Sequence, residues 1–414
     1  MPMRDPWCFP PSPKLDPRVD RVTTLEDAER CVRAIAARIP ITRVSDLSPL
    51  DRLRLPVFAA VTPLARDLTT HLGKGRDATS ARVSAMMEAV ERVSAESIPE
   101  SLTLRASFSD LEGSRSPLAV DPALFDLPDD TLYSADRAIT WVAGRELRSG
   151  IDILLAADLA LTPPADGVLR EVDTNGLASG STVIEAVVHA LCEVIERDAQ
   201  AQVEFFALFG APEGPPPPLA QIDPATLPAS ARGWLDALAA HDLHMAIHDI
   251  TSDIGVATFW AVLTDARFPT ADGVATLTFS GAGTAPRAEV ALLRAITEAV
   301  QSRVGVIHGA RDAWNLLPAG RRAESRTIRL RQLLPVQWKP FSAVPSFTST
   351  DLRDDLGFLL ARLAGAGMER VIAADLTRPD IGIPVVRVRV PGLSPFLVNR
   401  RRVGDRCLRH LLWP

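Results

Sequence analysis

Two segments of the chain carry the same pattern of serine, glutamate and arginine. The first reads SARVSAMMEAVERVSAE from Ser80, and the second reads STVIEAVVHALCEVIERDA from Ser181. Each contains Glu-x-x-Glu-Arg, and side chains three and four positions apart share one face of a helix. A single copy is typical of a solvated helix that carries an ion pair along its surface. Two copies, each preceded by a serine and a glycine-rich loop, indicate that both helices contribute to one site.

The polar residues of these helices form stripes on otherwise apolar segments, and a third segment, VALLRAITEAVQSRV, repeats the arrangement. The stripes consist of Ser84, Glu88, Glu91 and Arg92 in the first helix, of Ser181, Glu185, His189, Glu193, Glu196 and Arg197 in the second, and of Arg294, Glu298 and Gln301, with Arg303 nearby, in the third. Helices this apolar are largely buried, so their stripes cannot face bulk water along the whole length.

Several half-buried carboxylates in one place would repel one another and raise each other's pKa values unless cations neutralised them. Oxygen-only ligand sets favour Mg²⁺, which prefers a few carboxylates together with phosphate oxygens. Arginines interleaved with the glutamates suit those phosphates. The loops LGKGRDATS and DTNGLASGS each lead into a helix and could offer backbone N–H groups to an anion. The residues therefore predict a Mg²⁺–nucleotide site on three helices.

The elements that must position these helices are mixed in order. A helix over AERCVRAIAARI follows Thr23 and Glu26, which have capping-box spacing. Strands are predicted within ITRVSDLSPLDRLRLPVFAAVTP and within ITWVAGRELRSGIDILLAADLAL, the latter as a hairpin. Strand candidates LHMAIHDI, VATFWAVL, GVATLTFS, RVIAADLT and VVRVRV come later, and the proline-rich APEGPPPPLA reads as a surface excursion. Strands in runs between long helices favour an α+β fold over a doubly wound sheet.

Composition excludes several classes of function. The chain has 414 residues, is 47% hydrophobic and carries a formal net charge of −6, without a basic block and with a single tyrosine. We therefore expect no nucleic-acid partner. The four cysteines are far apart, which argues against a zinc knuckle and a disulfide framework. No apolar run reaches membrane-spanning length and the first residues do not form a signal peptide, so we expect a cytoplasmic protein without a membrane partner.

Three motifs in this order resemble the YcaO family of ATP-dependent enzymes that activate peptide backbone amides. They are GKGRDATSARVSAMMEAVERVSAE, TNGLASGSTVIEAVVHALCEVIERDA and SGAGTAPRAEVALLRAITEAVQSR, with RVRVPGL near the end also fitting. The resemblance implies one large YcaO-type domain over residues 66–414 with mixed sheets, preceded by residues 1–65 as an N-terminal extension and the start of the fold. It also implies ATP and Mg²⁺ as cofactors.

The resemblance assigns roles to individual residues. The implied Mg²⁺ ligands are Glu88, Glu91, Glu193 and Glu196, with Glu185 added. The implied nucleotide-binding residues are Lys74, Ser80, Ser84, Arg92, Asn175, Ala178, Ser181, Arg197 and Arg303. The implied catalytic residues are Arg294, Glu298 and Gln301. One departure is Thr284, because a histidine often stands at that position in the family.

The implied reaction needs no covalent protein nucleophile. A nucleophile adds to a peptide amide carbonyl, the resulting oxyanion attacks the γ-phosphate of ATP, and phosphate leaves from that carbon. The substrate would be a ribosomal precursor peptide. The ending RCLRHLLWP lacks the Pro-x-Pro-x-Pro tail of azoline-forming cyclodehydratases. This absence and the segment ITRVSDLSPLDRLRLPVFAAV resemble the YcaO proteins that form thioamides with a TfuA-like partner.

Two alternatives remain open. One is a stand-alone cyclodehydratase, in which a side chain of the peptide attacks to give an azoline or a macrocyclic amidine. The other is a non-catalytic ATP-binding accessory protein, which the intact set of glutamates and arginines argues against. The resemblance also leaves open whether the chain forms a homodimer.

Overall fold

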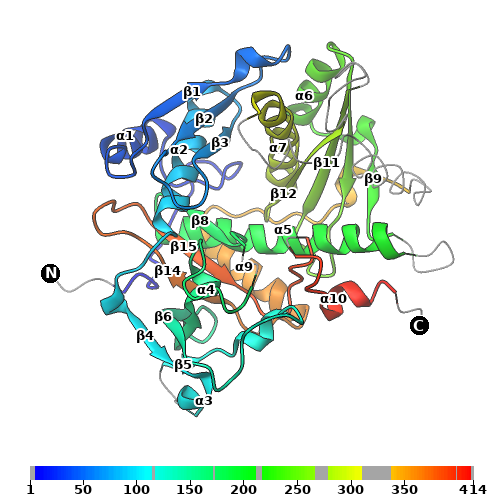
Figure 1. Ribbon diagram of the computed structural model, residues 1–414. Helices are drawn as coiled ribbons and strands as arrows, with labels where there is room; N and C mark the ends of the chain where they lie inside the picture. Colours follow the sequence, from blue (N-terminus) through cyan, green and yellow to red (C-terminus); the bar gives the residue numbers. More distant parts are fainter. Residues whose placement is uncertain are drawn as a thin grey trace.

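A computed structural model gives the architecture of the chain (Figure 1). The residues that the structure describes are 5–113, 117–170, 173–210, 217–265, 278–309, 337–397 and 399–411. Most of the predicted proline-rich excursion and part of the strand predicted at GVATLTFS therefore lie outside the described residues. Three sheets, each carrying a long helix, make up the described part of the chain.

The first sheet is antiparallel, in the order β1 (Arg43–Asp46), β2 (Val57–Val61), β3 (Thr70–Lys74). Helices α1 (Leu25–Ile35) and α2 (Ala78–Ser94) pack together beside it, and α2 lies against β2 and β3. The N-cap of α1 is Thr24, whose side chain accepts from the backbone N–H of Asp27. The predicted cap at Thr23 was one residue too early, because the hydroxyl of Thr23 is used elsewhere in the fold.

The second sheet has five strands and carries the third motif helix. Its order is β12 (Thr278–Thr284), β11 (Thr258–Asp265), β10 (Leu243–Asp249), β9 (Ala220–Ile222) and β13 (Trp338–Lys339). Helix α7 (Ala288–His308) packs on β12 and β11, and α6 (Ala229–Ala239) packs on β10 and α7. The apolar side of α7 is buried against this sheet, as its sequence pattern predicted.

The third sheet has seven strands and carries the second motif helix. Its order is β5 (Leu118–Ala119), β7 (Asp152–Ala156), β6 (Ile139–Glu146), β14 (Ile372–Asp375), β15 (Val385–Arg389) and β8 (Leu177–Ser179), with β4 (Thr103–Ala106) paired to β6. Strands β6 and β7 form the predicted hairpin. Helix α5 (Val183–Phe209) crosses β15 and β8 and packs beside α9 (Leu352–Gly365). The short helices are α3 (Phe108–Leu111), α4 (Ala157–Ala160), α10 (Asp405–Leu408) and the 3₁₀ turns Ser48–Leu50, Glu100–Leu102, Pro122–Phe125, Pro224–Thr226 and Phe341–Ala343.

Glycines let helices lie directly on strands at two of these junctions. A Cβ atom on Gly73 of β3 would stand 2.1 Å from the backbone nitrogen of Ala85 in α2. One on Gly283 of β12 would stand 2.1 Å from the carbonyl oxygen of Ala291 in α7. Both distances are far inside van der Waals contact, so no larger residue fits. The sequence suggested an anion-binding loop around Gly73, but both glycines are strand residues whose role is close packing.

The predicted α+β class is confirmed by this arrangement of mixed sheets and packed helices. The boundary predicted at residues 65/66 stays a prediction. Within the described residues, no helix is long and apolar enough to cross a membrane.

Candidate nucleotide site

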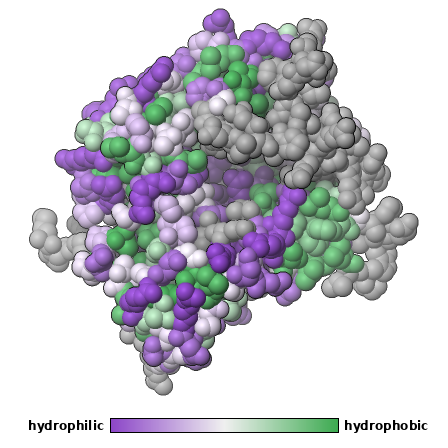
Figure 2. Space-filling view, viewed as in Figure 1, coloured by the Kyte–Doolittle hydropathy of each residue, from purple (hydrophilic) through white to green (hydrophobic). Residues whose placement is uncertain are grey.

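The three motif helices meet in a cyclic arrangement. Each helix packs on the strand that precedes it and also contacts the strand of another unit: α2 contacts β8, α5 contacts β12, and α7 contacts β3. In Figure 1, helices α2 and α7 lie above α5. The molecular surface is hollowed between them, and hydrophilic residues line the floor of the hollow (Figure 2). The contacts among these helices and strands bring the three polar stripes toward one space.

Side-chain contacts across the junctions hold the units together. Lys74 at the end of β3 donates from Nζ to Oε2 of Glu298 in α7. Ser179 at the end of β8 donates from its backbone N and its Oγ to Oε1 of Glu91 in α2, at 3.0 and 2.8 Å. Gln301 of α7 donates from Nε2 to the carbonyl oxygen of Leu72 in β3, at 2.8 Å. Glu91, Glu298 and Gln301 thus have partners from a neighbouring unit.

The glutamates of α2 and α5 repel one another in a buried place. Burial raises the pKa of Glu193 to about 7, and the carboxylates of Glu196 and Glu88 contribute to the rise. Burial also raises the pKa of Glu91, with Glu88 adding to the effect, and that of Glu196, with Glu298 adding. Carboxylates with raised pKa values gain from a cation beside them. This is the electrostatic signature that the sequence predicted for a metal site.

Cations face the same space from all three units. Arg92 donates to Oε1 of Glu88 and to Oδ2 of Asp67, both at 3.1 Å. The Nε of Arg197 lies 4.0 Å from Oε1 of Glu193, and its pKa is raised because Glu196, Glu298 and Glu193 outweigh burial. Arg294 donates from Nη1 to the carbonyl oxygen of Thr284, at 3.0 Å. These contacts are loose or partly solvated, which leaves the guanidinium groups N–H donors to offer to an anion.

His189 lies on the same face of α5 between Glu185 and Glu193. Burial lowers its pKa well below the usual value, and the positive charges of Arg294, Arg21 and Lys74 lower it further. The imidazole is therefore neutral at neutral pH. It can accept or donate a hydrogen bond without adding charge to the site.

The N-terminal segment occupies two of the residues predicted to bind cofactor. Arg21 donates from Nη1 to Oε1 of Glu185, at 2.6 Å, and the backbone N of Val22 lies 3.4 Å from Oε2. The hydroxyl of Thr23 donates to Oγ of Ser181, at 2.5 Å. Glu185 and Ser181 lie at the start of α5, on the side that carries the stripe. Within the described residues, both side chains are already hydrogen-bonded to the N-terminal segment, unlike the side chains of Glu88, Glu193 and Glu196.

The remaining predicted nucleotide residues differ in what their side chains do. Ser80 completes a capping box with Asp77 at the start of α2, and Oγ of Ser84 accepts from the backbone N of Lys74 at 3.4 Å. Ala178 is a buried residue of β8. Asn175 has a buried Oδ1 that accepts no hydrogen bond within the described part of the chain. Among the residues that the structure describes, no donor reaches that oxygen.

Arg303 does not lie with the other predicted nucleotide-binding residues. It is nine positions after Arg294, about half a turn around the helix at about 100° per residue. It is 1% exposed, donates to Oδ2 of Asp51 and to Oδ2 of Asp265, both at 2.7 Å, and lies over the ring of Phe279. The structure therefore places Arg303 in the core between α7 and the second sheet, where it compensates two buried carboxylates.

The donor set fits a Mg²⁺–nucleotide that brings its own ligands. Within the described residues, no three His, Cys, Asp or Glu side chains converge closely enough to hold a metal ion by themselves. Mg²⁺ binds through one or two carboxylates plus phosphate oxygens and water, so a ready-made protein cage is not expected. Glu88, Glu91, Glu193 and Glu196 would supply the carboxylates. The raised pKa values and the orphaned oxygen of Asn175 are consistent with that use.

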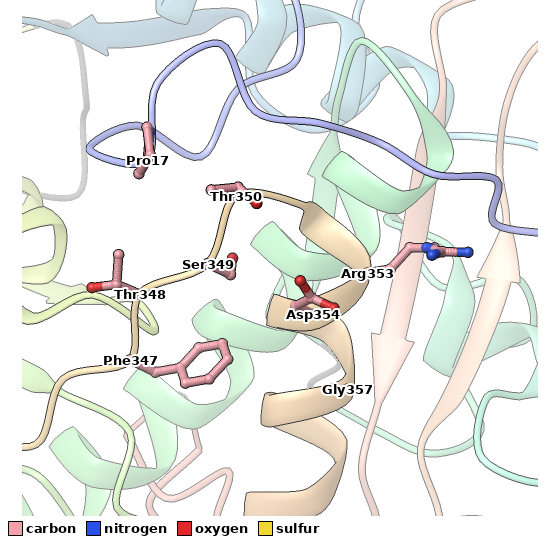
Figure 3. Close-up of a pocket in the computed structure, with 8 residues that line it drawn as sticks. All are labelled: Pro17, Phe347, Thr348, Ser349, Thr350, Arg353, Asp354 and Gly357. Atoms are coloured by element: carbon pink, nitrogen blue, oxygen red, sulfur yellow. The ribbon is translucent and has the colours of Figure 1, made fainter.

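A separate cavity of about 610 Å³ lies outside this group. Figure 3 shows its lining on three segments: Pro17 on the N-terminal segment, Phe347 to Thr350 on the loop before α9, and Arg353, Asp354 and Gly357 on α9. The ring of Phe347 stacks on Phe358, with centroids 4.4 Å apart. None of the residues predicted for the nucleotide lines this cavity, and we assign it no part in the site.

Comparison with known proteins agrees with the fold and with ATP and Mg²⁺ as cofactors. The family described as YcaO cyclodehydratase, ATP- and Mg²⁺-binding, matches residues 72–394. An uncharacterised protein of Methanothermobacter thermautotrophicus is 37% identical over 381 residues, covering 89% of this chain and 93% of that one. A protein of Rhizobium leguminosarum bv. trifolii, named for its place in the tfuA 3′ region, is 31% identical and covers 91% of this chain and 89% of its own.

A solved structure supports the same conclusion. YcaO from Methanopyrus kandleri, bound with AMPPCP and Mg²⁺, superposes with a TM-score of 0.74 at 25% identity, over 95% of this chain and 98% of that one. The fold and the family match define a nucleotide-binding α+β protein. The chain belongs to the YcaO family. The resemblance found in the sequence is thereby confirmed, as is the expectation of ATP and Mg²⁺ as cofactors.

The sequence analysis missed four residues that contact the predicted site residues. Asp67 pairs with Arg92, Ser179 holds Glu91, Arg21 pairs with Glu185, and Asp20 lies beside Arg294. Ser179 could have been found, because it directly follows Ala178 in the second glycine-rich loop. Asp67, Asp20 and Arg21 lie in segments without periodicity or motif, and no signal in the sequence points to them.

Proposed function

We propose that the chain uses ATP and Mg²⁺ to activate a peptide backbone amide by phosphorylating its carbonyl oxygen. The observation that carries the proposal is the meeting of buried glutamates from α2 and α5 with Lys74, Arg197 and Arg294 in one space. Membership of an ATP- and Mg²⁺-binding family supports it. The peptide would come from a ribosomal precursor.

The residues of this chain suit such a reaction through charge and alignment. A nucleophile adds to the amide carbonyl, and the oxyanion that forms attacks the γ-phosphorus of ATP, releasing ADP. The phosphorylated oxygen then leaves that carbon as phosphate. Arg197, Arg294 and Lys74 would neutralise phosphate charge as it redistributes, the main contribution that proteins make to phosphoryl transfer. Mg²⁺, held by the glutamates, would supply further positive charge to the phosphate oxygens.

Among the chemistries of the family, we favour thioamide formation, in which a sulfide source supplies the nucleophile and a TfuA-like protein assists. The name of the Rhizobium relative, which places it beside tfuA, supports this choice.

A stand-alone cyclodehydratase is the second candidate. The printed description of the family as cyclodehydratase supports it. In that case a Cys, Ser or Thr side chain of the peptide attacks the preceding carbonyl, and the same phosphorylation follows. A non-catalytic accessory role has no specific observation in its favour, because the charged groups of the site are all present.

The decisive experiment separates these functions by product mass. Purified protein is incubated with MgATP, a sulfide source and a precursor peptide encoded beside it, with and without a co-encoded TfuA-like protein. Exchange of one oxygen for sulfur identifies thioamidation, and loss of one water identifies cyclodehydration. Glu88→Gln and Glu196→Gln should both abolish ATP turnover while the far-UV spectrum stays unchanged. Normal turnover in both variants would contradict the proposed site.

A further inference from the structure

An N-terminal segment, residues 12–24, runs from α9 to the start of α5 and forms one side of the glutamate site. Its beginning is fixed by the backbone: Lys14 donates its N–H to the carbonyl oxygen of Thr350, at 2.9 Å, and the N–H of Leu352 donates to Ser12, at 3.0 Å. Pro13 and Asp351 form an antiparallel bridge. The segment is thus part of the folded core. Figure 3 shows its loop at Pro17 passing above the start of α9.

Two buried side chains of this segment form a chain of charges that ends in the site. Lys14 is 2% exposed and its Nζ lies 2.5 Å from Oδ2 of Asp355 and 3.5 Å from Oδ1 of Asp20. The other oxygen of Asp20, Oδ2, lies 3.5 Å from Nη2 of Arg294. Asp20 therefore stands between a lysine that belongs to the core and an arginine that faces the nucleotide space.

The contacts of Asp20 are unusual for a buried carboxylate. Its side chain is 6% exposed, yet neither oxygen accepts a hydrogen bond from any residue that the structure describes. Buried carboxylates are normally hydrogen-bonded as well as paired, since desolvation is otherwise uncompensated. Asp20 is instead held by two ion pairs of 3.5 Å, too long for hydrogen bonds. Such a contact orients a guanidinium and still leaves its N–H groups available for another acceptor.

The next residues of the segment hold the start of α5. Arg21 pairs with Glu185, and Thr23 donates to Ser181. Neighbouring side chains of one short segment therefore contact predicted site residues on two helices, α7 and α5. A segment that served only to cover the core would not need charged groups aimed at both.

We propose that Asp20 is a positioning residue that orients Arg294 toward the phosphates of a bound nucleoside triphosphate, with Lys14 fixing Asp20 from behind. The inference rests on the proposed function of the site. Within the described part of the chain, Arg294 contacts Asp20 and the carbonyl oxygen of Thr284. Removal of the Asp20 charge takes away the first of these contacts and leaves the hydrogen bond to the carbonyl. The guanidinium is then free to turn toward Glu196, whose carboxylate already interacts with it.

The test uses Asp20→Asn in the full chain, with Asp16→Asn as the matched control. Asp16 lies in the same segment, but its carboxylate is exposed and pairs with Arg18. Asp20→Asn should weaken binding of the non-hydrolysable analogue AMPPCP with Mg²⁺ by about tenfold to a hundredfold, the range for loss of one charge-assisted hydrogen bond. The KM for ATP should rise by a similar factor, with a smaller change in kcat. Asp16→Asn should leave both values unchanged.

A double-mutant cycle distinguishes positioning from a structural role. If Asp20 acts through Arg294, Asp20→Asn should have little further effect on AMPPCP binding in an Arg294→Lys background. Fully additive losses would overturn the proposal, and so would tighter binding by Asp20→Asn, because Asp20 would then compete with the phosphates. Equal thermal midpoints for the wild type and Asp20→Asn would confirm that the fold is not the cause. A variant that fails to fold is replaced by Asp20→Glu, which keeps the charge and should bind almost as well as the wild type.

A nucleotide-independent measurement separates this inference from the proposed function. Phenylglyoxal modifies accessible arginines, and peptide mass mapping reports the rate at Arg294. Asp20→Asn should raise that rate several-fold in the ligand-free protein, and Asp16→Asn should not. If the wild type binds no AMPPCP but the rate at Arg294 still rises, the proposed function fails and the pairing stands. An unchanged rate refutes the positioning role of Asp20 directly.

Discussion

Glu193 allows a specific prediction, because the ionised carboxylate that would bind Mg²⁺ lowers the stability of the ligand-free protein. Burial raises its pKa from 4.5 to about 7, with Glu196 and Glu88 adding to the effect. A rise of this size corresponds to about 3 kcal/mol. The folded state therefore disfavours the ionised carboxylate by up to that amount. The side chain is 24% exposed, and solvent screening should reduce the cost to about 1–2 kcal/mol.

The sign of the pH dependence follows from the direction of the shift. Because the folded-state pKa lies above the unfolded value, the folded protein binds more protons between pH 4.5 and about 7, and its stability falls as pH rises through that window. Above pH 7 the cost of Glu193 is fully present. Near pH 5 less than about 1 kcal/mol of it remains. Glu193→Gln removes the charge, so it should stabilise the ligand-free protein at pH 8 and hardly at pH 5.

The assay is thermal unfolding of both proteins at pH 5 and pH 8, with and without Mg²⁺ and AMPPCP. For a chain of this length, 2 kcal/mol corresponds to a midpoint change of about 2 °C. The wild type should gain stability from the nucleotide at pH 8, by about 2.7 kcal/mol when the ligand is at one hundred times its Kd. Glu193→Gln should start higher and gain little. Stability gained without pH dependence, or a full response to nucleotide, would refute the reasoning.

Glu289 provides the matched control on α7. A hydrogen bond from Ser230 and the charge of Arg287 lower its pKa although burial opposes them. The ionised form is therefore favoured in the folded state, and Glu289→Gln should slightly destabilise the protein above pH 5. Because Glu289 lies in the first turn of α7 and pairs outside the site, its variant should keep the full response to nucleotide.

Three further outcomes follow from the contacts. Lys74→Met should raise the KM for ATP at least about tenfold, because it removes a charge-assisted donor and leaves Glu298 unpaired; steady-state kinetics would show this, and an unchanged KM would exclude a phosphate role. Arg303→Met should lower the free energy of unfolding by about 3–5 kcal/mol, because the buried Asp51 and Asp265 each lose an ion pair, although Asp265 keeps its pair with Arg52; the calorimetric nucleotide affinity of the folded protein should stay the same. Nucleotide affinity of the wild type should rise from pH 6 to pH 8 as Glu193 ionises, and a flat profile would argue that this carboxylate takes no part in binding.

The sequence predicted the site best where polar residues recur at helical spacing on apolar helices. The stripes on α2, α5 and α7 could be predicted because each polar residue recurs at helical spacing among apolar ones, and the structure brings most of these residues to one space. Arg303 was grouped with them because it follows Gln301 closely. Its angle around α7 places it in the core, where Asp51 lies 252 positions away in the sequence.

The rest of the site depends on contacts between distant parts of the chain. Arg21 and Glu185 are 164 positions apart, and neither lies in a pattern that would reveal the other. The glycines of β3 and β12 show a different limit. A glycine-rich segment before a helix fits both an anion-binding loop and a strand that a helix must approach closely. Only the observed distances, 2.1 Å from a Cβ on Gly73 to the backbone of α2, decide between them.

The cyclic packing of the three units explains how one fold can bury so many like charges. Each motif helix is fixed on both sides, by its own strand and by a strand of another unit, so repulsion among the glutamates cannot separate the helices without breaking sheet contacts. Ser179 and Lys74 add hydrogen bonds at two of these junctions. The glutamates cannot move apart, and burial together with their mutual repulsion raises the pKa values of Glu91, Glu193 and Glu196. A Mg²⁺–nucleotide complex would bring a divalent cation to these carboxylates. Binding energy and folding stability are therefore coupled at this site, and neutralising a glutamate should improve the fold and harm the function together.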